Sequence, residues 1–218
     1  MTLRLITFDL DHTLWDPTDA LIAAEQAMFG WINEHSPVTA SFYPPEKFHA
    51  YKKDLAAAYP ELTGKVSEFR FQLLRRIFLQ SGHDSDTARR MAQDAFAAFY
   101  QARSTGLTLF ENVADVMAEL KESYTLIALT NGNADLDIAG HTHLFERHLK
   151  ADDYAAKPSP DMFEAALQHA GVEPRQALHI GDHPEQDVAA ARAVGMTTLW
   201  FNDKAVSYTH LTLPTIRE

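Results

Sequence analysis

The sequence predicts an α/β fold, in which a parallel sheet carries a block of helices inserted after its first strand. Three observations support this prediction. From residue 105 onward, short apolar runs alternate with helical patterns, which is typical of parallel strands joined by crossover helices. A similar apolar run stands alone at residues 3–8. Between the two, residues 16–104 show helical patterns only, so the first strand belongs to the later sheet and the helices form an insertion.

The first strand ends in two acidic residues. The run at residues 3–8 is too short for a buried helix and rich in strand-forming side chains, which indicates a buried parallel strand. Asp9 and Asp11 follow, and the two-residue period of an extended chain aims both beyond the carboxyl end, where open α/β sheets bind ligands. Two such carboxylates need a cation or a shared proton, so a divalent metal is expected. An isolated acidic pair also forms turns and helix caps, so the other motifs must decide.

Start and stop signals divide the inserted block into helices. Asp16-Pro17 favours a helix start, and apolar residues recur at helical spacing to about Asn33. Three prolines within residues 36–45 predict a break in the helical pattern. Further helices are expected at 45–58, 65–79 and 84–102.

The alternating region predicts the rest of the sheet. In order, we expect a helix at 112–121, a strand at 125–129, a short helix at 135–140, a short strand near Leu149, a helix at 160–170, a strand at 177–180, a helix at 185–194 and a strand at 197–200.

These elements divide the chain into a core of residues 1–15 and 105–205 and a helical cap of residues 16–104. Residues 206–218 are expected to be a non-native tail. They include the run VSYTHLTLPT, which resembles the translation of a sequencing adapter, and we leave them out of the fold.

Composition limits the class of protein. With 218 residues, 46% of them hydrophobic, the chain can bury a substantial core. A formal net charge of −11 without a broad basic stripe argues against nucleic acid as a partner. The chain shows no transmembrane stretch, no leader pattern and no cysteine, which together predict a cytoplasmic protein that does not associate with a membrane.

Polar residues also follow two later strands. Thr130, after the strand at 125–129, offers a hydroxyl and the next backbone amides to a phosphoryl oxygen. Asp182, after the strand at 177–180, supplies a third carboxylate of the kind that Mg²⁺ binds. Asp187 lies on the next helix, placed to hold the metal's waters or a lysine. Between them, Lys157 precedes a proline that keeps it extended, so that its amine can point inward.

These motifs together resemble the haloacid dehalogenase superfamily of phosphohydrolases. The superfamily's four motifs occur in order, and the resemblance covers nearly all of the chain: residues 9–13, residues 129–131, Lys157-Pro158 and residues 181–187. The resemblance implies a Rossmann-like parallel sheet core with an inserted helical cap of the first type. It also implies a magnesium-dependent phosphatase.

The resemblance implies a role for each motif residue. Asp9 attacks phosphorus to give an aspartyl-phosphate, and Asp11 protonates the leaving oxygen and then activates water. Thr130 binds the transferring phosphoryl group, and Lys157 offsets its charge. Mg²⁺ is held by Asp9, the backbone carbonyl of Asp11 and Asp182, with Asp187 outside the direct ligands.

Substrate choice is expected to lie in the cap. Residues 67–71 and 129–133 look similar to a bacterial subgroup that acts on flavin mononucleotide and on the ribitylaminouracil phosphate of riboflavin biosynthesis. Asn131 and Arg70 are therefore candidate substrate-binding residues, and the fork of donors on Arg70 suits a phosphate or a ring carbonyl. A surface salt bridge is the alternative for Arg70.

Several alternatives remain at this stage. Nucleoside monophosphate and phosphosugar phosphatases share the same four motifs. A 2-haloacid dehalogenase resembles the pattern with a residue other than aspartate at the place of Asp11, and a non-catalytic binding module is expected to lose Asp9 or Lys157. The expected partner is a small phosphorylated metabolite, and the expected state is a monomer or weak homodimer.

Overall fold

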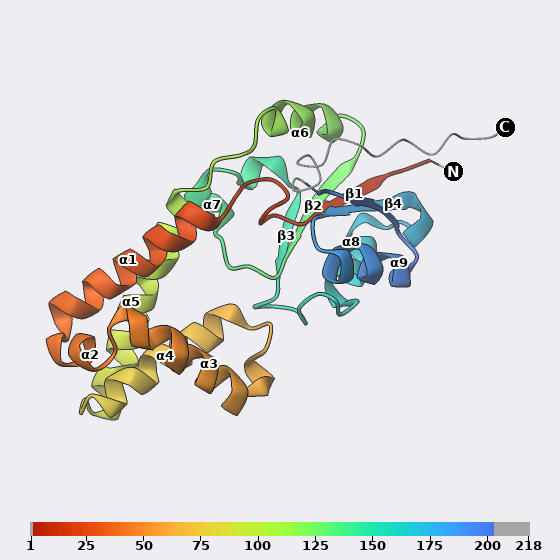
Figure 1. The fold of residues 1–218 in the computed structure, drawn as a ribbon. Helices are drawn as coiled ribbons and strands as arrows, with labels where there is room; N and C mark the ends of the chain where they lie inside the picture. The colour runs from red at the N-terminus through yellow and green to blue at the C-terminus, as the bar shows by residue number, and fades with distance from the viewer. Residues whose placement is uncertain (1, 203–218) are drawn as a thin grey trace, which may run out of the picture.

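The computed structural model describes residues 2–202 and contains one five-stranded sheet (Figure 1). The strand order is β3-β2-β1-β4-β5, and every neighbouring pair is parallel. This sheet confirms the predicted α/β fold class. Its strands are β1 (Leu5–Phe8), β2 (Thr125–Thr130), β3 (Arg147–Lys150), β4 (Ala177–Gly181) and β5 (Thr197–Trp200).

The first strand of the sequence occupies the centre of the sheet. Leu5 lies opposite Thr125 of β2 and opposite Ala177 of β4, so the three strands run in step. The register continues past β1, where the backbone N–H of Asp9 donates to the carbonyl of Ile180 at 2.8 Å. By this register Asp9, the residue that follows β1, lies level with Leu129 and Gly181 near the ends of β2 and β4.

Helices cover both faces of the sheet. On one face, Phe8 and Leu126 pack in a cluster with Met117 of α6 (Val113–Lys121). On the other, Leu129 packs with Phe163 of α8 (Asp161–Ala170). The remaining helices of this region are α7 (Leu136–Ala139) and α9 (Ala190–Val194).

The cap contains helices only and has its own core. A cluster that includes Met28, Phe78 and Phe99 fills the space between its long helices. These helices are α1 (Thr18–His35), α2 (Pro37–Phe42), α3 (Pro45–Ala58), α4 (Val66–Gln80) and α5 (Ser85–Thr105). They project from the sheet as a separate lobe, with α1 and α5 side by side (Figure 1).

Two predicted details need correction. The predicted break at residues 36–45 contains the helix α2, because Pro37 stands in its first turn, where proline fits without disrupting hydrogen bonds. The predicted helix at 185–194 begins as a wide π-helical segment, Pro184–Ala189, before α9. In this segment Val188 donates five residues back, to the carbonyl of His183.

Two further predictions concern the C-terminal tail and the membrane. The predicted non-native tail, residues 206–218, lies outside the described residues. Within the described part of the chain, no helix combines the length and the apolar character that crossing a membrane requires.

Gly181 must be a glycine because Asp187 folds back against it. A Cβ at this position would lie 2.4–2.6 Å from side-chain atoms of Asp187, which is buried and cannot move aside freely.

We expect Gly181→Ala to lower the free energy of unfolding by about 2 kcal/mol or more, as overpacking in a buried site does. Gly30, inside α1 with nothing within 4 Å, is the matched control: Gly30→Ala should stabilise by about 0.5–1 kcal/mol. Urea unfolding of both variants measures the contrast, and equal effects would contradict it.

Candidate active site

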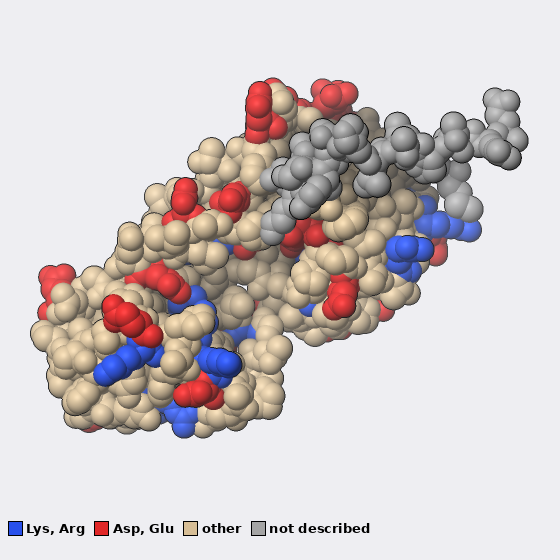
Figure 2. Space-filling view, viewed as in Figure 1, with Lys and Arg blue, Asp and Glu red and all other residues tan. Residues whose placement is uncertain are grey.

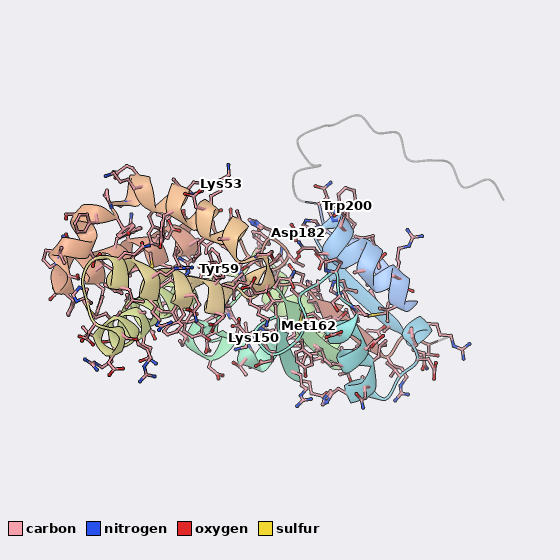
Figure 3. All side chains as sticks on the ribbon, turned by 90° about the horizontal axis from the view of Figure 1, so that it is seen from below. Lys53, Tyr59, Lys150, Met162, Asp182 and Trp200 are labelled. Atoms are coloured by element: carbon pink, nitrogen blue, oxygen red, sulfur yellow. The ribbon has the colours of Figure 1, made fainter. Side chains whose placement is uncertain are left out.

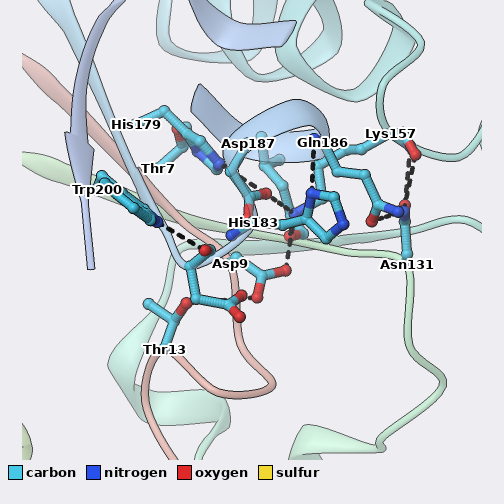
Figure 4. A network of polar contacts seen from close by, with 12 residues as sticks. Thr7, Asp9, Thr13, Asn131, Lys157, His179, His183, Gln186, Asp187 and Trp200 are labelled. Carbon is cyan, nitrogen blue, oxygen red and sulfur yellow. Dashed lines mark hydrogen bonds and ion pairs between the residues drawn. The ribbon is translucent and has the colours of Figure 1, made fainter. Parts of the chain in front are cut away.

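A buried lysine joins the carboxylates at the carboxyl end of the sheet. Lys157 Nζ donates to Asp9 Oδ1 at 2.7 Å, to Asp187 Oδ1 at 2.6 Å and to the carbonyl of Leu129 at 2.9 Å (Figure 4). Lys157 is only 3% exposed, and Asp9 and Asp187 are buried as well. Because an ammonium has three N–H groups, these contacts use all of its donors and fix its position.

Asn131 holds the backbone that carries this lysine. Its side-chain Oδ1 accepts from the N–H of Lys157 at 2.8 Å, and its Nδ2 donates to the Lys157 carbonyl at 2.8 Å and to Gln186 Oε1 at 2.9 Å. The side chain thus ties together the segments that follow β2, β3 and β4. Its predicted contact with substrate stays a prediction, and its side-chain amide is engaged by the protein itself.

The buried charges shift one another's protonation. Burial raises the pKa of Asp9 from 3.8 to about 7, although Lys157 opposes the rise. Burial also tends to raise the pKa of Asp187. The hydrogen bonds and charges of His179 and Lys157 outweigh this effect and hold the pKa of Asp187 below its usual range. Burial also lowers the pKa of His179 to about 4, so its ring is neutral near pH 7. Without a further cation, Asp9 is therefore the carboxylate that takes up a proton.

Three carboxylates fit a hard cation at this point. Oxygen atoms of Asp9, Asp182 and Asp187 lie within 4.8 Å of one another. Burial and the nearby Asp187 raise the pKa of Asp182, another sign of excess negative charge. Asp187 already accepts from Lys157 and His179 with one oxygen and from the N–H of His183 with the other. Among the described residues, Asp9 Oδ2 accepts only one long hydrogen bond, from Thr13 at 3.4 Å, so Asp9 and Asp182 have the oxygen atoms best placed to hold Mg²⁺ directly.

Thr130 and Asp11 meet beside a glycine. Thr130 is buried at the end of β2, and its Oγ1 accepts from the N–H of Gly132 at 2.9 Å. A Cβ on Gly132 would lie 2.8 Å from Asp11 Oδ2 and 3.2 Å from Thr130 Oγ1. The absence of a side chain at Gly132 thus keeps both oxygens clear of crowding at the carboxyl end of the sheet.

Arg103 of the cap holds Asp11, and the sequence analysis missed this residue. Arg103 Nη2 lies 2.6 Å from Asp11 Oδ1 and 2.7 Å from Oδ2, and Trp15 Nε1 donates to Oδ1 at 2.8 Å. Arg103 is 1% exposed although it is charged. The sequence did carry a signal: Arg103 continues the buried apolar stripe of α5, four residues after Phe99. A charge on such a stripe indicates a buried partner.

His179 is a second residue that sequence analysis missed. It lies in β4, where Nδ1 contacts Thr7 Oγ1 at 2.8 Å and Nε2 contacts Asp187 Oδ1 at 3.2 Å. Its place in a buried strand was the available signal, because a polar side chain there needs a partner.

Arg70 lies in the cap, apart from the Asp9 cluster. Its guanidinium carbon stands 3.5 Å from the centroid of the Phe99 ring, and its Nη1 is buried without a hydrogen-bond partner among the described residues. The alternative of a surface salt bridge therefore has no support in this part of the chain. Its role as a substrate-binding residue stays a prediction.

Comparison with known families identifies the family of this chain. The model of the haloacid dehalogenase-like hydrolases matches residues 3–195. The chain belongs to this hydrolase family. The structure brings the predicted motif residues Asp9, Lys157, Asp182 and Asp187 together, and their catalytic roles stay predictions.

Relatives of this hydrolase carry different activities. The 5-amino-6-(5-phospho-D-ribitylamino)uracil phosphatase YigB of Escherichia coli is 29% identical over 89% of this chain and 82% of the relative. A phosphoserine phosphatase of Thermus thermophilus is 28% identical over 91% of this chain and 88% of the relative. A solved structure of a 2-haloacid dehalogenase from Pseudomonas syringae is 34% identical with a TM-score of 0.87, covering 98% of this chain and 92% of that one.

The raised pKa of Asp9 predicts a pH-dependent stability of the metal-free protein. A carboxyl whose pKa rises from 3.8 to about 7 on folding favours the folded state while it is protonated. That contribution is complete below pH 4 and is lost as the pH rises through 7, with a slope of at most about 1.4 kcal/mol per pH unit. Asp9→Asn should therefore gain about 1–3 kcal/mol relative to wild type between pH 5 and pH 8.

Urea unfolding at both pH values in the presence of a chelator measures this difference. Groups that titrate in both proteins, such as His179, cancel in the comparison. Parallel pH profiles of variant and wild type would contradict the assignment.

Proposed function

We propose that this hydrolase is a Mg²⁺-dependent phosphatase that cleaves a small phosphomonoester through an aspartyl-phosphate intermediate. One observation carries the proposal: Asp9 lies beyond the central strand, 2.7 Å from a buried ammonium and within 4.8 Å of two further carboxylates. A carboxylate placed in this way suits attack on a phosphoryl group whose negative charge its neighbours offset.

The proposed reaction has two steps. In the first, an Asp9 oxygen forms a bond to phosphorus, the ester oxygen leaves with the bonding electrons, and Asp11 gives it a proton. In the second, Asp11 takes a proton from water, whose oxygen attacks phosphorus and frees Asp9 and inorganic phosphate. Lys157 offsets the negative charge near Asp9, and Thr130 offers its hydroxyl to the phosphoryl group.

The donor set of Asp9 and Asp182 fits Mg²⁺, with the Asp11 carbonyl as a third proposed ligand. When bound there, Mg²⁺ supplies positive charge that polarises the phosphoryl oxygens. Asp187 acts indirectly, since it holds Lys157 at 2.6 Å and presents no free oxygen.

For the substrate we propose flavin mononucleotide or ribitylaminouracil phosphate, which places the enzyme in riboflavin biosynthesis or flavin metabolism. The named activity of the Escherichia coli relative supports the second compound. Arg70 and Asn131 are the proposed substrate-binding residues. Nucleoside monophosphates and phosphosugars are the alternatives. A cytoplasmic monomer or weak homodimer completes the proposal, and the lack of cysteine fits a reducing compartment.

A dehalogenase is the second candidate, because a solved structure bearing that name is 34% identical to this chain. Asp11 and Asp182 favour the phosphatase, since attack on a carbon–halogen bond needs neither a leaving-group acid nor a metal. Chloride release from 2-chloropropionate distinguishes the two reactions.

The proposal is tested by a phosphate-release screen over flavin mononucleotide, ribitylaminouracil phosphate, nucleoside monophosphates and sugar phosphates. We expect turnover that requires Mg²⁺, stops with a chelator and falls by at least about a thousandfold in Asp9→Asn, which lacks the nucleophile. Asp115→Asn, at an exposed position on α6, is the matched control and should keep wild-type activity. Phosphate release by Asp9→Asn at the wild-type rate would refute the mechanism.

We further expect Arg103 to position Asp11 for proton transfer. Arg103→Met should lower kcat by about a hundredfold for glycerol 2-phosphate, whose alkoxide needs a proton, and by less than about tenfold for p-nitrophenyl phosphate, whose phenolate leaves unprotonated. Asp11→Asn should show the same selectivity, and the double variant should lose little more. Arg89→Met, exposed on the same helix, is the control. Equal losses on both substrates would indicate a structural role only.

A further inference from the structure

A cavity in the cap gathers positive charge. It has a volume of about 470 Å³ and lies between α3, α4 and the loop that joins them. Two aromatic rings, Tyr59 and Phe69, and three cations, Lys52, Lys53 and Arg70, line it, and the described residues place no carboxylate on its walls. Basic side chains gather on the cap in Figure 2, and Figure 3 labels Lys53 and Tyr59 there. This concentration contrasts with the chain's net charge of −11.

Two of these cations are partly buried and poorly compensated. Arg70 stacks on Phe99 with Nη1 buried and unpartnered among the described residues, and burial lowers its pKa to about 10. Burial, and then the charge of Arg70, lower the pKa of Lys52. The attraction of Glu25 is the opposing influence on both groups. Holding two partly buried cations near each other costs free energy, which an anionic or strongly accepting ligand would recover.

Contacts between the cap and the core place this cavity beside the carboxyl end of the sheet. Ser67, three residues before Arg70 on α4, donates to Asp152 at 2.7 Å and accepts from Asn133 at 3.2 Å. Gly64, in the cavity wall, approaches Ala156 so closely that a Cβ would lie 2.6 Å from the Ala156 Cβ. Residue 156 immediately precedes Lys157. The cavity therefore lies over the segments that follow β2 and β3.

A second path leads from the cavity to Asp11 along α5. Arg70 rests on Phe99, and Arg103, one helical turn further on the same buried face, holds Asp11. Phe99, which supports Arg70, is thus about one turn of helix, or roughly 6 Å along α5, from Arg103, which holds the proposed proton donor.

We propose that Lys52 and Arg70 form a subsite for the leaving group of the substrate, and that this subsite selects leaving groups with a pair of acceptor oxygens. A carboxylate and the two carbonyls of a pyrimidinedione ring share this chemistry. The rings of Tyr59 and Phe69 contact the planar or apolar part of the same group. The inference rests on the proposed phosphatase function and adds what that function leaves open, the class of compound released.

Matched substrate pairs test the subsite. The first pair is 4-carboxyphenyl phosphate and phenyl phosphate, which differ in the carboxylate only. The second is uridine and cytidine 5′-monophosphate, in which the C4 carbonyl of uracil is replaced by the amino group of cytosine. We expect the wild-type enzyme to prefer the first member of at least one pair in kcat/KM, and the preferred pair identifies whether a carboxylate or a dicarbonyl edge is bound.

Variants assign that preference to the two cations. Lys52→Met and Arg70→Met should each lower the selectivity ratio of the preferred pair by about tenfold to a hundredfold, mainly through KM, because a charge-assisted hydrogen bond is lost. Arg70→Lys keeps the charge and should retain part of the ratio. Lys47→Met, at an exposed position on α3 outside the cavity, should leave the ratio unchanged.

A binding measurement separates the subsite from the chemistry. Calorimetry with 4-hydroxybenzoate and with uridine, the products of the two preferred substrates, should show binding that weakens in Lys52→Met and Arg70→Met. If the wild-type enzyme hydrolyses phenyl phosphate but its selectivity is the same in all variants, the subsite is refuted and the phosphatase function stands. If no phosphate ester is hydrolysed, the phosphatase function fails and the leaving-group subsite fails with it.

Discussion

The ammonium of Lys157 is the interaction on which the site depends. A buried ammonium is costly unless every donor is paired, and here two carboxylates and one carbonyl meet its three N–H groups. The pairing leaves the site negative, because Asp9, Asp182 and Asp187 stand against a single cation while His179 is neutral. Two excess negative charges match one divalent ion. The raised pKa of Asp9 has the same cause, since in the absence of another cation a proton is the available counter-charge.

The topology explains why distant residues can share this lysine. β1 lies between β2 and β4, so the chain brings residue 9 next to the segments that follow residues 130 and 181. Asn131 then joins the loop of Lys157 to Gln186, and Gly181 leaves room for Asp187 to turn back. Each of these supports comes from a different strand end. The local sequence therefore needs only a short motif at each strand end, and the register of the sheet brings these motifs together.

Local patterns predicted the sheet and the inserted helices, because each depends on periodicity. The roles of the motif residues stay predictions, although the structure brings Asp9, Asp182 and Asp187 together. The pairing of Arg103 with Asp11 spans 92 positions and leaves no local pattern beyond a charge on an apolar stripe. The burial of His179 in a strand indicates that it needs a partner, but the partner Asp187 is brought to it by a π-helical segment that the sequence did not predict. The helix α2 escaped prediction for a different reason: proline was taken as a break, although it is compatible with a first turn.

The long helix α5 links the two parts of the molecule. Its buried face carries Phe99, which supports Arg70 in the cap cavity, and Arg103, which reaches Asp11 at the sheet. Because Phe99 and Arg103 lie on one helix, the spacing between the supports of Arg70 and of Asp11 is set by helix geometry rather than by a loop. A leaving group that reaches Arg70 while its ester oxygen stays at Asp11 must match that spacing. In the proposed mechanism, the same helix that positions Asp11 therefore also limits the length of the substrate.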